Sequence, residues 1–205
     1  MGALVATLWI ILIIIVVVIA WLIVIFNRMV ILKNRFQNAF AQIEVQLKRR
    51  HDLIPNLVET AKAYLKHEHE TLQEVIDARN GAAKGLSGLK NSLTDPTLVQ
   101  TFAAAEQSLQ SALGRFNMVV ENYPELKADK QMIMVHEEIT STENRIGFAR
   151  QFYNDMVTEY NVFRQLFPNN LVAGLFGHEK DAVLLEFDDK PQSAIMVAPK
   201  VDFTA

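Results

Sequence analysis

The sequence predicts an all-α protein, in which an N-terminal transmembrane helix continues into a long antiparallel three-helix bundle, followed by a short tail that can hold β-strands. Two observations predict this class. The chain begins with an uninterrupted apolar stretch, and three later segments repeat apolar residues at alternating intervals of three and four. We divide the chain into a transmembrane anchor (1–27), a helical domain (28–177) and a tail (178–205).

The anchor is predicted from residues 4–26, which are apolar apart from Thr7. As a helix rising ~1.5 Å per residue, this stretch is long enough to cross a hydrocarbon core of about 30 Å. A cleaved signal peptide is the alternative, but its apolar part is normally about 7–15 residues long, after a basic start and before a small-residue cleavage site. Here the apolar part is longer, no cation precedes it and no A-x-A follows it, so we expect a retained span.

The charges that flank the span predict its orientation. Residues 1–27 carry no charged side chain, whereas six cations follow the span closely: Arg28, Lys33, Arg35, Lys48, Arg49 and Arg50. The positive-inside rule therefore places the N-terminus outside and residues 28–205 in the cytoplasm. The net charge of −3 gives no basic field for nucleic acid, so no nucleic-acid partner is expected. The apolar span makes the lipid bilayer an expected partner.

The first helix of the domain has a regular apolar seam that continues through Pro55. We therefore predict one helix that is kinked at Pro55 and ends near Asn80. The alternative is a restart with Asp52 as N-cap, because proline is tolerated in a first turn. A loop is expected next, from its glycines and a Thr-Asp-Pro sequence: Gly81, Gly85, Gly88 and 94–96.

Two further helices complete the predicted bundle. The second starts near Asp95, with Pro96 in its first turn, and the third follows the turn at 121–129 and stops at Pro168. One helical turn is predicted between Asn170 and Gly177, at the end of the helical domain. The tail follows it. Its two apolar runs, 182–187 and 194–203, are short strands or disordered segments.

Long motifs in this order resemble the LemA family. They are "NRFQNAFAQIEVQLKRRHDLIPNLVETAKAYLKHEHETLQEVIDARNGA", "ENYPELKAD", "STENRIGFARQFYNDMVTEYN" and "FPNNLVAGLFG", which together cover about residues 28–177, and the closing "APKVDF" also fits. The resemblance implies a bacterial inner-membrane protein with one N-terminal span and a cytoplasmic helical domain. It also implies links to a membrane protease, or to the building of intracellular membrane compartments, but no active site.

Sequence signatures of enzymes and cofactor sites are absent. The chain has no Cys, no H-E-x-x-H, no G-x-S-x-G and no G-x-x-x-x-G-K-[ST]. In "HEHE", His67 and His69 are two residues apart on a helix and point in different directions, so they cannot chelate one metal from one face. We therefore expect no catalytic residues, no cofactor and no metal. A metal-binding or catalytic bundle is the alternative.

The "RRHD" sequence places a cation on the apolar seam, since Arg50 falls between Leu47 and Ile54. A cation there must find a partner or reach solvent. With a first helix ending near Asn80, helix lengths place the 121–129 turn beside Pro55. This predicts a latch that joins the turn to the kink, with the following members: Arg49, Arg50, Pro55, Glu121 and Glu125. Arginines that merely extend outward are the alternative.

The same helix lengths leave the membrane-proximal part of the first helix uncovered. Its seam is an apolar stripe, which we call the helix-1 stripe: Met29, Leu32, Phe36, Phe40, Ile43 and Leu47. Soluble surfaces rarely keep such a patch exposed. Neighbouring subunits or the bilayer surface are candidate covers, and we favour neighbours, which predicts a homo-oligomer with coiled-coil contacts.

These observations predict a non-enzymatic, membrane-anchored helical scaffold. It would self-associate through the helix-1 stripe and engage membrane-protein partners, including a membrane protease, or the membrane surface. A sensor of external ligands is disfavoured, because fewer than ten residues precede the apolar core of the span.

Overall fold

The computed structural model describes residues 1–90 and 92–186. This part of the chain is largely helical and contains no strand, which confirms the predicted all-α class. The helices are α1 (Gly2–Lys62), α2 (His69–Leu89), α3 (Pro96–Val120), α4 (Pro124–Lys127), α5 (Lys130–Gln165) and α6 (Asn169–Leu175).

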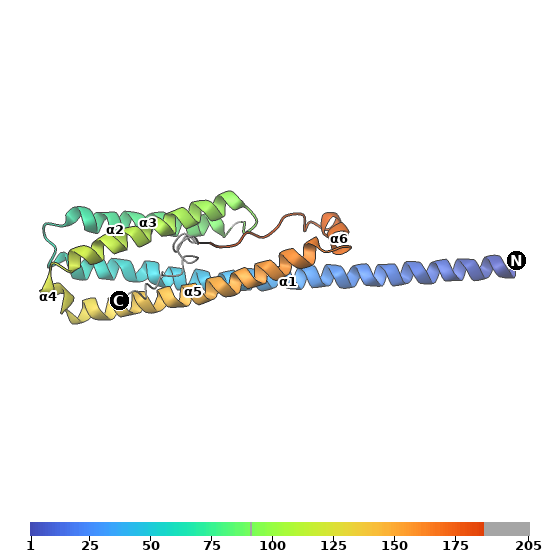
Figure 1. Ribbon diagram of the computed structural model, residues 1–205, viewed down its shortest axis with the longest axis horizontal. Helices are drawn as coiled ribbons and strands as arrows, with labels where there is room; N and C mark the ends of the chain where they lie inside the picture. Colours follow the sequence, from blue (N-terminus) through green and yellow to red (C-terminus); the bar gives the residue numbers. More distant parts are fainter. Residues whose placement is uncertain (91, 187–205) are drawn as a thin grey trace, which may run out of the picture.

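Four long helices, rather than the predicted three, lie side by side in the bundle (Figure 1). α1 packs against α5, α2 packs against α3, and α1 also contacts α2. The prediction was wrong because the chain reverses at 63–68, so the first helix ends at Lys62 instead of near Asn80. This turn contains neither Gly nor Pro, and it buries Leu65, so the apolar pattern passes through it unbroken.

The connection between α2 and α3 was predicted only in part. Gly81, Gly85 and Gly88 lie inside α2 rather than in a loop. At Gly85 an added Cβ would lie 3.4 Å from the Cα of Phe102, an ordinary van der Waals distance, so α2 and α3 are in contact at this point. The predicted helix start is confirmed, because the Asp95 side chain accepts a hydrogen bond from the Thr97 backbone N–H at 2.9 Å.

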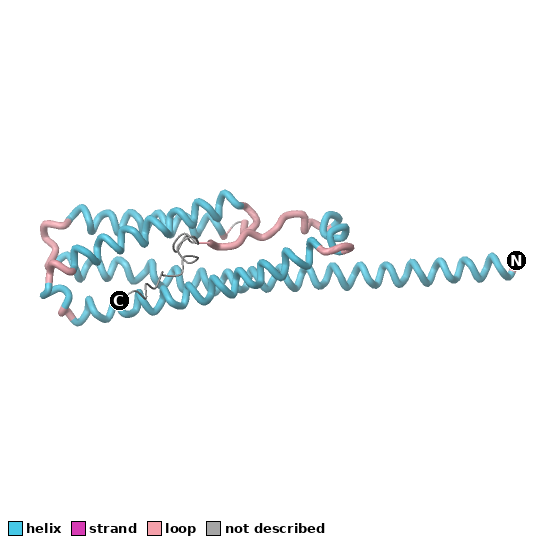
Figure 2. The backbone as a smooth tube through the Cα atoms, in the orientation of Figure 1, coloured by secondary structure: helices cyan, strands magenta, loops and turns pink. Residues whose placement is uncertain are grey.

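α1 continues without interruption from the apolar stretch to the far end of the bundle (Figure 2). Pro55 lies inside this helix, which confirms a single helix there and excludes a restart at Asp52. An 18-residue window of α1 has a mean hydropathy of 3.6 and is only 6% buried. By length and composition, this part of α1 can cross a membrane.

The start of the tail is an extended segment, residues 182–185, which we call the strap. The Asn161 side chain donates to the Ala182 carbonyl at 2.8 Å and accepts from the Ala182 N–H at 2.9 Å. Asn154 pairs with both backbone groups of Leu185 in the same way, at 3.1 and 2.9 Å. The described part of the predicted strand 182–187 is therefore paired with side-chain amides of α5 and, through the Val183 N–H, with the Leu93 carbonyl at 3.0 Å, but not with a strand. The predicted strand 194–203 lies outside the described residues.

Candidate functional site

The core of the bundle consists of two apolar clusters. The membrane-side cluster includes Leu47, and the distal cluster, farther from the N-terminus of α1, includes Ile54. Between these two residues, α1 buries Arg50 and His51, and α3 buries Glu106 beside them. We call these three residues the polar layer. Each is at most 7% exposed, so their charges and hydrogen bonds must be satisfied largely within the protein.

The Glu106 carboxylate contacts both buried polar residues of α1. The Arg50 guanidinium donates to one oxygen of Glu106, and His51 Nε2 lies 3.1 Å from the other. Since an ionised carboxylate only accepts hydrogen bonds, His51 donates through Nε2. α2 joins the layer from outside, because Arg79 Nε donates to the His51 carbonyl at 2.9 Å. The layer thus ties α1 to both α2 and α3.

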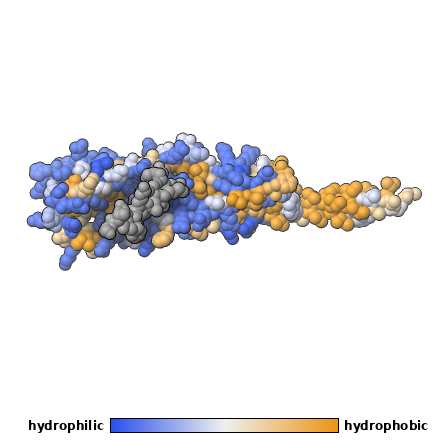
Figure 3. Space-filling view, in the orientation of Figure 1, coloured by the Kyte–Doolittle hydropathy of each residue, from blue (hydrophilic) through white to orange (hydrophobic). Residues whose placement is uncertain are grey.

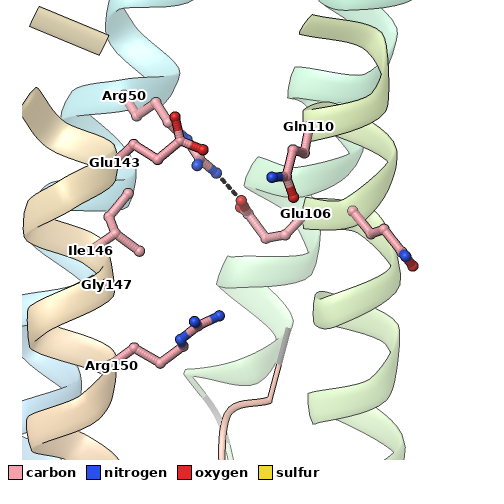
Figure 4. Close-up of a pocket in the computed structure, with 8 residues that line it drawn as sticks. Arg50, Glu106, Gln110, Glu143, Ile146, Gly147 and Arg150 are labelled. Atoms are coloured by element: carbon pink, nitrogen blue, oxygen red, sulfur yellow. Dashed lines mark hydrogen bonds and ion pairs between the residues drawn. The ribbon is translucent and has the colours of Figure 1, made fainter. Parts of the chain in front are cut away.

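A small cavity of about 70 Å³ opens beside the polar layer, between α3 and α5 (Figure 4). Arg50 and Glu106 line its inner side, and Glu143 and Arg150 extend towards it from α5. Its remaining lining residues are Gln107, Gln110, Ile146 and Gly147. Such a volume accommodates a few water molecules, whereas pockets for small-molecule ligands typically measure about 300–1,000 Å³. Arg50 Nε is buried and makes no hydrogen bond to any described residue, so a water in this cavity can serve it.

The chemistry of the layer is that of a structural ion pair. A histidine beside a carboxylate resembles an acid–base pair. Here, however, His51 is 2% exposed, its Nε2 already contacts Glu106, and the same carboxylate also binds Arg50. Removing one partner of such a buried pair is strongly destabilising, so Arg50 and Glu106 belong together in the folded bundle.

The predicted latch is wrong in its partners. Arg50 binds Glu106 rather than Glu121 or Glu125, and Arg49 pairs with Glu138 of α5. Because the chain reverses at 63–68, the 121–129 turn lies beside that reversal at the distal end of the bundle, and not beside Arg50. There the Tyr64 hydroxyl donates to Asp129 at 3.2 Å.

The other members of the predicted latch are also apart from Arg50. Pro55 is exposed on α1, Glu121 follows the end of α3, and Glu125 lies in the first turn of α4. The hydrogen bond from Tyr64 to Asp129, together with the charge of Glu125, raises the pKa of the Tyr64 hydroxyl.

The helix-1 stripe is buried within one protomer, so the premise for self-association through it is wrong. All six of its residues, from Met29 to Leu47, are at most 4% exposed. α5, the adjacent ends of α2 and α3, and the strap cover most of the stripe, and α6 covers Met29. The prediction failed because α5 and the tail extend back beside α1, as far as Arg28, which pairs with Glu159 at 2.9 Å.

Glu106 is the site residue that sequence reasoning missed. A signal for it exists, because Glu106 falls between Phe102 and Leu109 on the seam of α3. A buried acid on one seam is the natural partner for a buried cation such as Arg50 on another. Comparing charges at seam positions across all helices would have found the pair without knowledge of the topology.

The His-rich sequence lies at the distal turn. His67 is in the turn and His69 begins α2, and both side chains are exposed. Within the described ranges, no three His, Asp or Glu side chains are grouped so that they could hold a metal ion.

Comparisons with known proteins agree with the helical motifs. A family model described as the LemA family matches residues 39–203. Protein LemA of Metamycoplasma hominis is 28% identical over 141 residues, a match that covers 69% of this chain and 60% of that protein. Magnetosome protein MamQ 2 of Paramagnetospirillum magneticum is 26% identical over 192 residues, covering 86% of this chain and 70% of the relative. Magnetosome protein MamQ of Magnetospirillum gryphiswaldense is 24% identical over 181 residues, a match that covers 81% of this chain and 65% of that protein.

Proposed function

The chain belongs to the LemA family, and from this premise we propose that it is a membrane-anchored, non-enzymatic helical scaffold that holds a binding surface for membrane-protein partners above the membrane. The observation that carries the proposal is that α1 is both the apolar helix and a central helix of the bundle. Any partner that contacts the bundle is thereby fixed relative to the bilayer.

The dimensions of the bundle support this role. From Arg28, the first charged residue, to the end of α1 at Lys62 there are 35 residues, counting both ends, or about 50 Å at 1.5 Å per residue. The bundle is therefore long enough to reach past the lipid headgroups. Magnetosome proteins among the relatives favour a role at membranes, and we place the bundle on the cytoplasmic side from the charges after the span.

Two ion pairs between α1 and α5 support a rigid connection at the membrane end. Arg28 pairs with Glu159 at 2.9 Å, and Arg35 lies 3.7 Å from the same carboxylate. Together with the polar layer farther along α1, they connect the bundle to the anchor at two levels. Exposed ion pairs contribute about 0–1 kcal/mol each, so the apolar core supplies most of this rigidity.

A partner surface is supported by two exposed aromatic residues on α5. Phe148 and Phe152 are four residues apart, so they share one helix face, and both are exposed. Exposed aromatic side chains are enriched where proteins bind one another.

Photocrosslinking in native membranes tests the proposal. A photoreactive amino acid at Phe148 is expected to capture a discrete integral membrane protein, and the same probe at Met118, an exposed apolar residue of α3, is not. The same products at both positions, or none at Phe148, would contradict a partner surface on α5. Metal analysis of the purified protein addresses the alternative, because stoichiometric iron, manganese or zinc would favour a metal-binding bundle.

Labelling tests the orientation separately. The chain contains no Cys, so a single Ser87→Cys change on α2 provides a unique thiol in an exposed position. In intact cells, a membrane-impermeant maleimide is expected to leave this thiol unlabelled and to label it only after lysis. Labelling before lysis would place the bundle outside.

A further inference from the structure

The segment that connects α5 to the strap contains a run without charge. Residues 165–178 include no Asp, Glu, Lys or Arg, and Arg164 and Glu179 flank the run on either side. α6 lies within it, and Gly177, with a φ of +75°, follows the helix. After the apolar stretch of α1, no other part of the sequence runs as long without an Asp, Glu, Lys or Arg.

One face of α6 packs on the end of the apolar stretch of α1. Val172 and Ala173 are buried against Ile25 and Met29. Leu22 also contacts this group, and it precedes the first charged residue, Arg28, by six positions, or about 9 Å along the helix. If α1 spans a bilayer, α6 therefore lies at the level where the hydrocarbon core meets the headgroups.

The remaining faces of this segment expose large apolar side chains, which we call the apolar collar. Each of the following residues is more than half exposed: Leu166, Phe167, Leu171, Leu175 and Phe176. The space-filling view shows apolar surface at this end of the bundle, next to the apolar surface of α1 (Figure 3). Monomeric soluble proteins rarely expose large contiguous apolar patches without a function.

Contacts with α5 and α1 hold the collar in place. Arg164 Nε donates to Asp181 at 3.0 Å and its Nη1 donates to the Glu179 carbonyl at 3.0 Å, which fixes the chain after α6 against the end of α5. At the start of α6, the Asn169 side chain donates to the Phe163 carbonyl at 2.9 Å. Phe176 packs on Phe26 of α1, with ring centroids 5.2 Å apart. Both ends of the segment are therefore pinned, and its apolar side chains face outward.

We propose that the apolar collar is embedded in the interfacial region of the bilayer as a second membrane attachment beside α1. The inference rests on the membrane anchor of the proposed function. Lipid is the occupant because the collar is continuous with the span and lies at the level that headgroups and acyl chains must occupy around it. A single spanning helix leaves the bundle free to rotate about that helix, whereas two attachment points fix which face of the bundle turns towards the membrane.

Site-specific fluorescence in proteoliposomes tests the collar. The Cys-free chain allows single changes Leu175→Cys and Phe167→Cys in the collar, Leu8→Cys in the span as a positive control, and Met134→Cys at the distal end as an exposed apolar control. Each full-length variant is labelled with an environment-sensitive fluorophore and reconstituted in phosphatidylcholine–phosphatidylglycerol vesicles, with or without lipids carrying a quencher near the headgroup. We expect blue-shifted emission and several-fold stronger lipid quenching at Leu175 and Phe167 than at Met134.

The controls separate the possible failures. If the Leu8 label is quenched but the collar labels behave like the Met134 label, the collar proposal is wrong while the anchor stands. If the Leu8 label is not quenched either, the anchor and the proposed function both fail. Collar labels that are shielded from water but not quenched by lipid, to an extent that rises with the protein-to-lipid ratio, would show that a second copy covers the collar and would overturn the proposal.

Discussion

The two halves of the bundle core differ in how they are closed. In the membrane-side cluster, aromatic rings pack on one another; for example, Phe36 packs on Tyr160 with ring centroids 5.1 Å apart. The strap, which comes much later in the chain than α1, completes this cluster. The distal cluster is mostly aliphatic, and the turns that close it, 63–68 and 121–129, join neighbouring helices. Local turns can close the distal half early in folding, whereas the membrane-side half must wait for contacts between distant segments.

This difference implies that the membrane-side half depends more on individual contacts. The strap buries Ala182 and Leu185 against α1 and α5, and the Tyr153 hydroxyl donates to the Val183 carbonyl at 2.9 Å. Burial raises the pKa of Tyr153, so this hydroxyl remains a donor at any physiological pH. The polar layer lies between the two halves, and it is the first place to test whether they are coupled.

Removing the carboxylate of the polar layer is expected to have the largest effect. Glu106→Ala leaves Arg50 buried without its partner and should lower the free energy of unfolding by about 3–5 kcal/mol. The matched control is Glu138→Ala, which removes the exposed partner of Arg49 and should cost about 0–1 kcal/mol. Chemical unfolding of the full-length protein in detergent, followed by circular dichroism, measures both. Equal losses would mean that the buried pair contributes no more to stability than the exposed one.

The helix-1 stripe offers the next comparison. Leu32→Ala should cost about 2–5 kcal/mol, because it opens a cavity in the membrane-side cluster. Ile31→Ala, at the exposed neighbouring position, should change stability by no more than about 0.5 kcal/mol. Unfolding at several protein concentrations distinguishes burial in a protomer from burial between subunits. A Leu32→Ala loss that depends on concentration would restore the self-association hypothesis.

The same division between the halves explains what the sequence could predict. The apolar run located the N-terminal helix, Asp95 with Pro96 located the start of α3, and Pro168 located the end of α5, because each signal depends on residues close together in the chain. Periodicity did not detect the reversal at 63–68, since Leu65 continues the apolar pattern there. Nor did it detect the strap, whose backbone partners include Asn154, Asn161 and the Leu93 carbonyl, about 20–90 residues away. Arg50 was correctly expected to need a partner. That partner was misassigned because a wrong helix length moved the 121–129 turn beside it.

Loosening the strap should have a smaller and more local effect. Asn161→Ala leaves both backbone groups of Ala182 without their partner, which should cost about 1–3 kcal/mol. Hydrogen exchange should become faster in residues 182–186 and in the part of α1 beneath them, while the distal cluster stays protected. Asn122→Ala is the control, because it removes one exposed hydrogen bond of 3.4 Å. Uniformly faster exchange in both halves would show that the strap supports the whole bundle and not the membrane-side half in particular.

The smallest effect expected is a pH dependence confined to the membrane-side end. His178 is buried beside Tyr160, whose hydroxyl lies 3.1 Å from its Nδ1, and burial followed by the charge of Lys33 lowers the pKa of His178 below its ordinary value. A histidine with a lowered folded-state pKa binds more protons when unfolded. Its contribution to stability is therefore fully present above about pH 6.5, the unfolded value, and is lost as the pH falls through the folded pKa.

Replacing His178 tests this dependence, because His178→Gln removes the titrating group. Its unfolding free energy should fall less between pH 7 and pH 5 than that of the unmodified protein. His67→Gln, at an exposed position in the distal turn, should leave the unmodified slope unchanged. If both variants retain that slope, the acid sensitivity of the bundle does not arise at His178, and the membrane-side end is no more sensitive to protons than the distal end.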